Sequence, residues 1–128
     1  SQDNGIITTC DEICGVGAIQ ISCVRRDKKS PPELIEAIEL AEVFAQERGW
    51  RLQKKEIVSY QIDNSPVSEF VFIERDDEPT FWQVWHIVEE KRAAFITYNC
   101  SLADAEKELM ARQEIIKSFK WERGKAQS

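Results

Sequence analysis

The fold is decided by the stretch Phe81–Val88, which reads FWQVWHIV. Its aromatic and β-branched residues favour an extended strand, and successive side chains on a strand point to opposite faces of the sheet. Both faces of this strand are apolar, so we expect a sheet that other elements cover on its two sides. The two sets of side chains are Phe81, Trp85 and Ile87 on one face, and Trp82, Val84 and Val88 on the other.

Further strands are predicted before and after this stretch. Alternating or β-branched runs that are separated by polar turns and glycines are typical of antiparallel strands. We expect the first two strands to form a hairpin and the strands 67–74, 81–88 and 93–99 to form an antiparallel meander. The expected strands are Ile6–Cys10, Val16–Arg25, one strand or two short ones within Trp50–Tyr60, Val67–Glu74 and Ala93–Asn99.

Two amphipathic helices are also predicted. Ser30 before two prolines is typical of a helix start and Gly49 of a helix end, which together predict a helix over Pro32–Arg48. Ser101 begins a second helix over Leu102–Phe119 by the same capping argument. The expected buried stripes are Leu34, Ile38, Ala41 and Ala45, broadened by Ile35, Val43 and Phe44, in the first helix, and Leu102, Ala105, Leu109, Gln113, Ile116 and Phe119 in the second.

We therefore expect one α+β domain over residues 1–128, a twisted, mainly antiparallel sheet with two helices packed against it. A chain of 128 residues is long enough to bury a core without a metal or a disulfide. The four cysteines do not form the two closely spaced pairs of a structural zinc site, so free thiols in a reducing compartment, the cytoplasm, are favoured. We expect no metal and no cofactor. The cysteines are Cys10, Cys14, Cys23 and Cys100.

The charge balance and the short apolar runs exclude two classes of partner. The net charge is −6, from 17 Lys and Arg against 23 Asp and Glu. Nucleic-acid binding needs a basic surface, and the cluster 25–29, RRDKK, is too small to provide one, so we interpret it as a solvated connection. No apolar run approaches the about 20 residues of a membrane-spanning helix. We therefore expect neither nucleic acid nor a membrane as a partner.

The negative charge is concentrated in two segments. Residues 33–48 carry five Glu and one Arg, and residues 61–80 carry six acids and one Arg. Acidic surfaces attract basic proteins over a long range, and tryptophan is frequent at protein interfaces. A surface that only keeps the protein in solution is the alternative interpretation. The candidate partner-binding residues are Glu36, Glu39, Glu42, Asp76, Asp77 and Trp82.

His86 is the only histidine, and it lies within the aromatic stretch 81–88. A packed core residue is the favoured interpretation, and two functional alternatives stay open. One is a small-ligand pocket formed by Trp82, His86 and Tyr98. The other is an enzyme that uses Cys100 or His86, alone or as a thiol–imidazole pair. The sequence contains neither a Gly-x-Ser-x-Gly motif nor a phosphate-binding glycine loop, so we expect no catalytic residues.

Three segments resemble those of small, mostly uncharacterised bacterial proteins. The run 15–22, GVGAIQIS, is similar to a hairpin that reads GvGALQIS, and FWQVW at 81–85 is similar to their aromatic strand. The run 95–100, FITYNC, with IIKSF at 115–119, is similar to their C-terminal FITYNC…IIkSik element. The resemblance implies a PsbP-like α/β/α sandwich that is used for binding, and some of these proteins resemble immunity proteins that neutralise a toxin.

The leading hypothesis is therefore a non-catalytic protein-binding domain of the immunity or adaptor kind, with a basic protein as its partner. The first alternative is the small-ligand-binding domain described above. Another, by fold analogy with PsbP, is an assembly protein of the photosynthetic apparatus. The sequence does not indicate the oligomeric state.

Overall fold

The computed structural model describes residues 6–8 and 17–119, so Cys14, the turn 11–15 and the end of the first expected strand lie outside the described residues. The strands are β1 (Ile6–Thr8), β2 (Ala18–Arg25), β3 (Val58–Ile62), β4 (Ser65–Glu74), β5 (Thr80–Val88) and β6 (Arg92–Ser101). The helices are α1 (Leu34–Glu47) and α2 (Leu109–Lys117), with short 3-10 helices η2 (Lys54–Glu56) and η3 (Leu102–Asp104).

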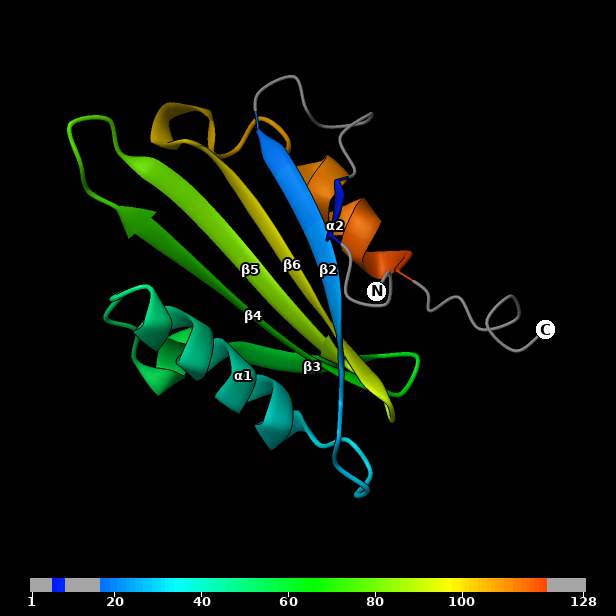
Figure 1. Cartoon of the computed structure of the whole chain (residues 1–128). Coiled ribbons are helices and arrows are strands. Elements are labelled where there is room, and N and C mark those ends of the chain that lie inside the picture. Colours follow the sequence, from blue (N-terminus) through cyan, green and yellow to red (C-terminus); the bar gives the residue numbers. More distant parts are fainter. Residues whose placement is uncertain (1–5, 9–16, 120–128) are drawn as a thin grey trace.

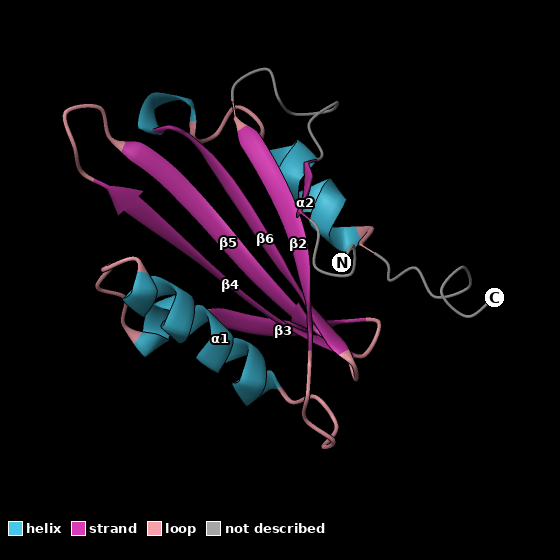
Figure 2. Cartoon of the chain, in the orientation of Figure 1, coloured by secondary structure: helices cyan, strands magenta, loops and turns pink. Residues whose placement is uncertain are grey.

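The described strands form one antiparallel sheet of six strands in the order β1-β2-β6-β5-β4-β3. The hairpin of β1 with β2 and the meander of β4, β5 and β6 are both as predicted, and β3 extends the meander by one strand. The segment 50–60 contains the start of one strand, β3, which η2 precedes. Figures 1 and 2 show α1 and α2 on opposite sides of the twisted sheet. The predicted fold class, an α+β domain with two helices, is confirmed.

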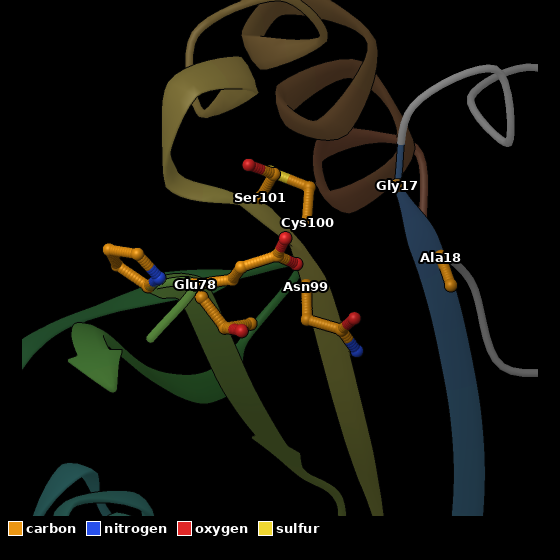
Figure 3. Close-up of a pocket in the computed structure, with 8 residues that line it drawn as sticks. Gly17, Ala18, Glu78, Asn99, Cys100 and Ser101 are labelled. Carbon is orange, nitrogen blue, oxygen red and sulfur yellow. The ribbon is translucent and has the colours of Figure 1, made fainter. Parts of the chain in front are cut away.

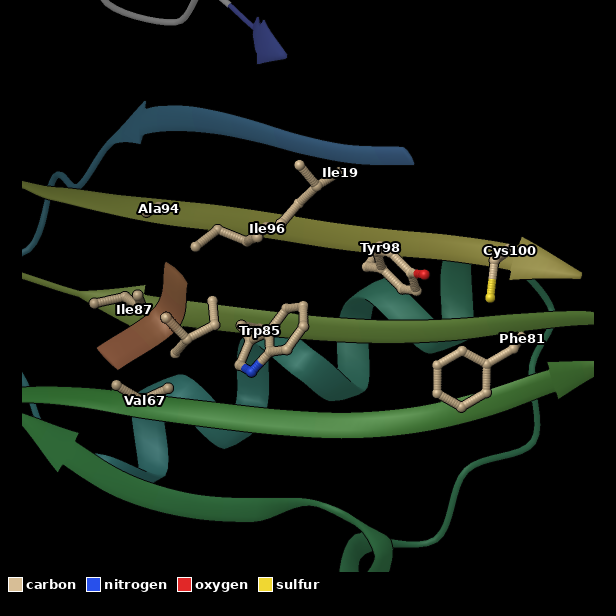
Figure 4. Packing of buried hydrophobic residues seen from close by; sticks show 10 residues of the cluster. Ile19, Val67, Phe81, Trp85, Ile87, Ala94, Ile96, Tyr98 and Cys100 are labelled. Carbon is tan, nitrogen blue, oxygen red and sulfur yellow. The ribbon is translucent and has the colours of Figure 1, made fainter. Parts of the chain in front are cut away.

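β5 lies between β4 and β6, and its two faces belong to two separate cores. Figure 4 shows the core on the α2 face, where Trp85 is only 2% exposed. The predicted alternation of β5 is confirmed, because Trp85 lies in this core and Val84 lies in the other. The α2-face core contains Ile19, Val67, Phe81, Trp85, Ile87, Ala94, Ile96, Tyr98, Cys100 and Ile116, and the α1-face core contains Ala41, Ala45, Trp50, Ile57, Phe70 and Val84.

Helix α1 begins later than predicted. Its N-cap is Glu33, which has an extended backbone and no side-chain capping hydrogen bond, so the prediction of Ser30 as the cap is wrong. A residue before a proline is pushed toward extended conformations, and this keeps Pro31 out of the helix. The end of the helix is as predicted, because Arg48 is the C-cap and Gly49 has a left-handed φ of 76°.

The buried stripe of α1 is narrower than predicted. Its fully buried residues are three alanines, which let the helix backbone approach the sheet closely. The larger apolar side chains then lie at the sides of the contact, and Val43 is 49% exposed. The buried alanines are Ala37, Ala41 and Ala45, whereas Leu34, Ile35 and Val43, which were predicted to be buried, are exposed.

The connection between β2 and α1 is not wholly solvated, contrary to the prediction. The side chain of Arg26 donates from Nε and Nη2 to the carboxylate of Glu36 at 2.6 and 2.7 Å, and from Nη1 to the carbonyl of Glu90 at 2.8 Å. These hydrogen bonds raise the pKa of Arg26 and lower that of Glu36. The pair therefore ties the start of α1 to the turn between β5 and β6.

Helix α2 also begins later than predicted, at Leu109 instead of Leu102. The N–H of Leu102 donates to the carbonyl of Pro79 at 3.0 Å, which holds the chain against the β4–β5 turn. The predicted buried position Gln113 is exposed, and Arg112 is buried in its place. Leu109, which was also predicted to be buried, is exposed, whereas Ile116 is buried as predicted.

Arg112 is buried because polar and aromatic groups surround its guanidinium. Its Nε donates to Oε1 of Gln83 at 2.9 Å, and its central carbon lies 4.3 Å from the ring centroid of Tyr98. Nε2 of Gln83 donates in turn to Glu69 at 2.9 Å. The buried charge is thus connected through an amide to a carboxylate, whereas Nη1 of Arg112 is buried without a hydrogen-bond partner among the described residues.

Gly17, directly before β2, leaves no room for a side chain. A Cβ at this position would overlap the phenol ring of Tyr98, which is fully buried. We expect Gly17→Ala to lower the free energy of unfolding, measured by urea denaturation, by ~1–3 kcal/mol, the usual cost of overpacking. Ala18→Ser, which adds one heavy atom at the exposed neighbour, is the control and should change it by less than about 0.5 kcal/mol. Equal stabilities of the two variants would contradict the packing.

Candidate functional site

The three residues of the predicted ligand pocket lie on different faces of the sheet. Trp82 and His86 belong to the α1 face of β5, where they contact the α1-side aromatic residues. Tyr98 belongs to the α2 face of β6, and Figure 4 shows it on the same side as Trp85. Because the sheet separates them, the prediction of a pocket formed by Trp82, His86 and Tyr98 is wrong.

His86 is a buried core residue, as the favoured interpretation predicted. Its imidazole stacks on Phe95 with 5.0 Å between ring centroids, and the ring of Phe44 meets it edge-on at 6.0 Å. His86 and Ser68 stand opposite each other on β5 and β4, and Nδ1 of His86 and Oγ of Ser68 are buried without hydrogen-bond partners among the described residues. Burial lowers the pKa of His86 to about 4, so the imidazole is neutral near pH 7.

Cys100 and His86 do not form the thiol–imidazole pair that the sequence left open. Cys100 stands opposite Phe81 and faces α2, whereas His86 stands opposite Phe95 and faces α1. Burial raises the pKa of the Cys100 thiol, which keeps it protonated and weakly nucleophilic near pH 7. Cys23 is also a free thiol with a pKa that burial raises.

The described residues contain neither a cluster of possible metal ligands nor a membrane-spanning helix. Over residues 6–8 and 17–119, no three His, Cys, Asp or Glu side chains come together as a possible metal site. None of the helices in these residues combines the length and the apolar composition needed to cross a bilayer.

A polar pocket of about 370 Å³ lies at the end of the sheet where β2 and β5 begin and β6 ends. Figure 3 shows the side chains of Glu78, Asn99 and Ser101 around it. The pocket offers one carboxylate beside neutral polar groups, and none of the residues predicted for ligand binding lines it. Its lining residues are Gly17, Ala18, Glu78, Pro79, Thr80, Asn99, Cys100 and Ser101.

The acidic residues predicted to bind a partner are not equally available. The carboxylate of Glu36 is bound in the internal ion pair described above, so this residue is not part of a free acidic surface. Glu39 is exposed on α1, and Glu42 is half-buried one turn further along the helix. Asp76 and Asp77 are exposed in the turn between β4 and β5.

Trp82, the remaining predicted residue, belongs to an aromatic cluster at the end of α1. The ring centroids of Trp82 and Trp50 lie 5.5 Å apart, and the two ring planes are inclined by 55°. Glu74 connects them, because its two carboxylate oxygens accept hydrogen bonds from the two indole Nε1 groups, each at 3.0 Å. The ring of Trp50 also stacks on that of Phe72, with 4.6 Å between the ring centroids. We call Trp50, Glu74 and Trp82 the tryptophan cradle.

The guanidinium of Arg48 lies over the tryptophan cradle. Its central carbon is 4.5 Å from the ring centroid of Trp82, 4.9 Å from that of Trp50 and 5.6 Å from that of Phe44. A cation within about 6 Å of an aromatic face is attracted by the quadrupole of the ring. The helix end determines this arrangement, because Arg48 and Trp50 are the two neighbours of the left-handed Gly49.

A hollow of about 640 Å³ adjoins the cradle on the α1 side of Trp50. It lies between the last turns of α1 and the segment that leads into η2. Its charged groups are the carboxylates of Glu42 and Glu56 and the guanidinium of Arg51. The cradle and the hollow share Trp50, so they form one surface of indole rings and carboxylates. The hollow is lined by Glu42, Ala45, Gln46, Trp50, Arg51, Leu52, Gln53 and Glu56.

Sequence reasoning identified Trp82 and missed Arg48, Trp50 and Glu74 as members of the same site. One local signal could have found Glu74: a short turn over 75–79 predicts that the strands on its two sides pair, which brings Glu74 close to Trp82. The position of Trp50 depends on the chain reversal after α1 and on packing against β4, which no local pattern shows.

Comparisons with known proteins show the fold and no more. No protein-family model and no curated protein matches the chain. A Pseudomonas aeruginosa protein of unknown function, PA94, proposed as a regulator, has a TM-score of 0.68 and 12% identity over 96% of this chain and 87% of that one. A Bacteroides thetaiotaomicron protein has a TM-score of 0.60 and 11% identity over 93% of this chain. This chain spans only 39% of that protein's length.

The buried histidine makes stability depend on pH. The pKa of His86 is about 4 in the folded protein against an ordinary value of 6.5, so the unfolded chain binds the additional proton between these values and stability is lost as the pH falls through them. We expect the free energy of unfolding to fall by ~2 kcal/mol between about pH 7.5 and about pH 5. His86→Phe, which keeps an aromatic ring at this position, should remove most of this loss. An undiminished loss in that variant, measured by urea denaturation at both pH values, would contradict the assignment.

Proposed function

We propose that the protein is a non-catalytic binding domain of the immunity or adaptor kind, whose partner is a basic protein. The observation that carries this proposal is the tryptophan cradle, with the carboxylate of Glu74 between its rings and further acidic residues in the segments that adjoin it. Glu42 lines the hollow that adjoins it, and Asp76 and Asp77 lie two and three residues beyond Glu74.

This combination is typical of a protein-binding surface. Tryptophans supply a large and rigid contact area at the centre of interfaces, where they contribute much of the binding energy. Carboxylates around them attract a positively charged partner and increase its association rate. The resemblance to bacterial proteins with a PsbP-like fold, some of them immunity-like, supports a binding role. The acidic balance favours a basic protein over nucleic acid as the partner.

Two further expectations belong to this proposal. The free thiols of Cys23 and Cys100 support a reducing compartment such as the cytoplasm. An assembly role in photosynthesis rests on the analogy with PsbP alone, and no feature of the described residues favours it.

Small-ligand binding is the second candidate function, and one observation favours it. The polar pocket in Figure 3 has a volume of about 370 Å³, within the range of small-molecule sites. The two candidates differ in what the native protein retains, a basic protein or a small molecule, so one capture experiment can separate them.

The test is affinity capture from source cells with immobilised wild-type protein and two charge variants. Asp76→Lys/Asp77→Lys reverses the charge beside the tryptophan cradle, and Glu106→Lys/Glu114→Lys reverses the same number of exposed charges on the α2 side. We expect a basic protein to bind the wild type and the α2 variant, to bind the cradle-side variant at least about tenfold more weakly, and to dissociate at high ionic strength.

Two results would contradict the proposal. One is equal retention of the partner by both charge variants, which would place binding elsewhere. The other is retention of no protein together with a stoichiometric small molecule in the native mass spectrum, which would favour the second candidate function.

A further inference from the structure

We propose that the tryptophan cradle is a guanidinium-binding site that the protein's own Arg48 occupies, and that an arginine side chain of the partner replaces Arg48 there. The statement that the replacing arginine belongs to a partner protein rests on the proposed function. The guanidinium site itself does not, because it can be measured with a small cation and without any partner.

The shape of the cradle suits a flat cation. The planes of Trp50 and Trp82 are inclined by 55°, and the central carbon of Arg48 lies within 5 Å of both ring centroids. A guanidinium is planar and weakly hydrated, so it stacks on aromatic faces better than an ammonium does. The structure thus shows a guanidinium already seated on the two rings, which identifies the ligand chemistry directly.

Glu74 prepares the cradle for a cation in two ways. Its carboxylate accepts from both indole N–H groups, and this fixes the two rings relative to each other before any ligand binds. It also places a negative charge at the edge of both rings, where it adds to the attraction of their faces for a cation. A carboxylate beside two aromatic rings is the composition expected of a cation-binding surface.

Arg48 is held weakly enough to be replaced. It is exposed, and among the described residues its side chain makes no hydrogen bond or ion pair, only the contacts with the aromatic rings. A cation–π contact at an exposed site is worth about 0.5–1 kcal/mol. A partner's arginine that makes the same contacts has to displace only these weak interactions.

The position of Arg48 on the tryptophan cradle has a measurable consequence for the binding of an external guanidinium. While Arg48 covers the rings, a free guanidinium binds only to the fraction of molecules in which Arg48 has left, which weakens the apparent affinity. Removal of Arg48 should therefore strengthen the binding of an external guanidinium. Removal of an ordinary binding residue has the opposite effect, because it weakens the binding of the ligand.

The experiment is a titration of the ¹⁵N-labelled protein with arginine amide, followed through the indole N–H resonances. We expect the resonances of Trp50 and Trp82 to shift saturably while that of the buried Trp85 stays constant, and we expect Arg48→Ala to bind about fivefold more tightly than the wild type. Arg25→Ala is the matched control, because it removes an exposed arginine at the opposite end of the sheet from Trp82 and should leave the affinity unchanged.

Two further measurements make the test specific. In the Arg48→Ala background, Trp82→Leu should abolish the shift of the Trp50 resonance, with a urea midpoint that verifies folding of the variant. Lysine amide, of equal charge, should bind more weakly than arginine amide. Equal affinities of Arg48→Ala and the wild type for arginine amide, or equal affinities for the two amides, would overturn the proposal.

The same variants separate this site from the proposed function. If a captured protein partner is retained more strongly by Arg48→Ala than by Arg25→Ala, the cradle is the site that the partner uses. If its retention is the same for both, the cradle is not that site. If arginine amide binds as expected and no protein is captured, the guanidinium site stands and the proposed function fails.

Discussion

The position of β5 between β4 and β6 is the constraint on which the rest of the structure depends. Its side chains alternate between two cores, with Trp85 on one face and Val84 on the other. Each square ångström of apolar surface left in water costs about 25 cal/mol, so neither face of a sheet built on this strand is stable when uncovered. One strand therefore requires two helices on opposite sides, and this gives the layered arrangement in Figure 2.

The two helices meet this requirement with different chemistry. Helix α1 presents alanines and approaches the aromatic side chains of the sheet closely. Helix α2 presents Arg112, whose burial is possible because β5 carries the polar Gln83 on that face and Glu69 stands next to it on β4. Gln83 lies among apolar side chains on this face of β5, and its hydrogen bond with Arg112 explains why an amide is buried there. Arg112 comes 29 residues later in the chain.

Strands, turns and their order could be predicted because period-two patterns and polar turns are local signals. The errors come from interactions between distant segments. The start of α1 depends on the proline restriction at Pro31 and on the ion pair of Arg26 with Glu36, which no local pattern reveals. The ligand pocket was wrong because the face of Tyr98 depends on the register between β5 and β6, which the turn between them determines. Of the candidate site, sequence reasoning found Trp82, since it lies within a strand whose pattern is local, but not the residues that fold back onto it.

The end of α1 explains why the tryptophan cradle exists at all. The left-handed Gly49 reverses the chain, and the N–H of Trp50 then donates to the carbonyl of Ala45 at 2.9 Å, which brings the indole back toward the sheet. Trp50 is only 7% exposed, so the ring that forms one wall of the cradle is also part of the α1-face core. A ligand on the cradle therefore contacts a ring that packing already holds in place, and little conformational entropy is lost on binding. In the proposed function, this surface is therefore formed before a partner binds, and the exposed side chain of Arg48 is the part that has to move.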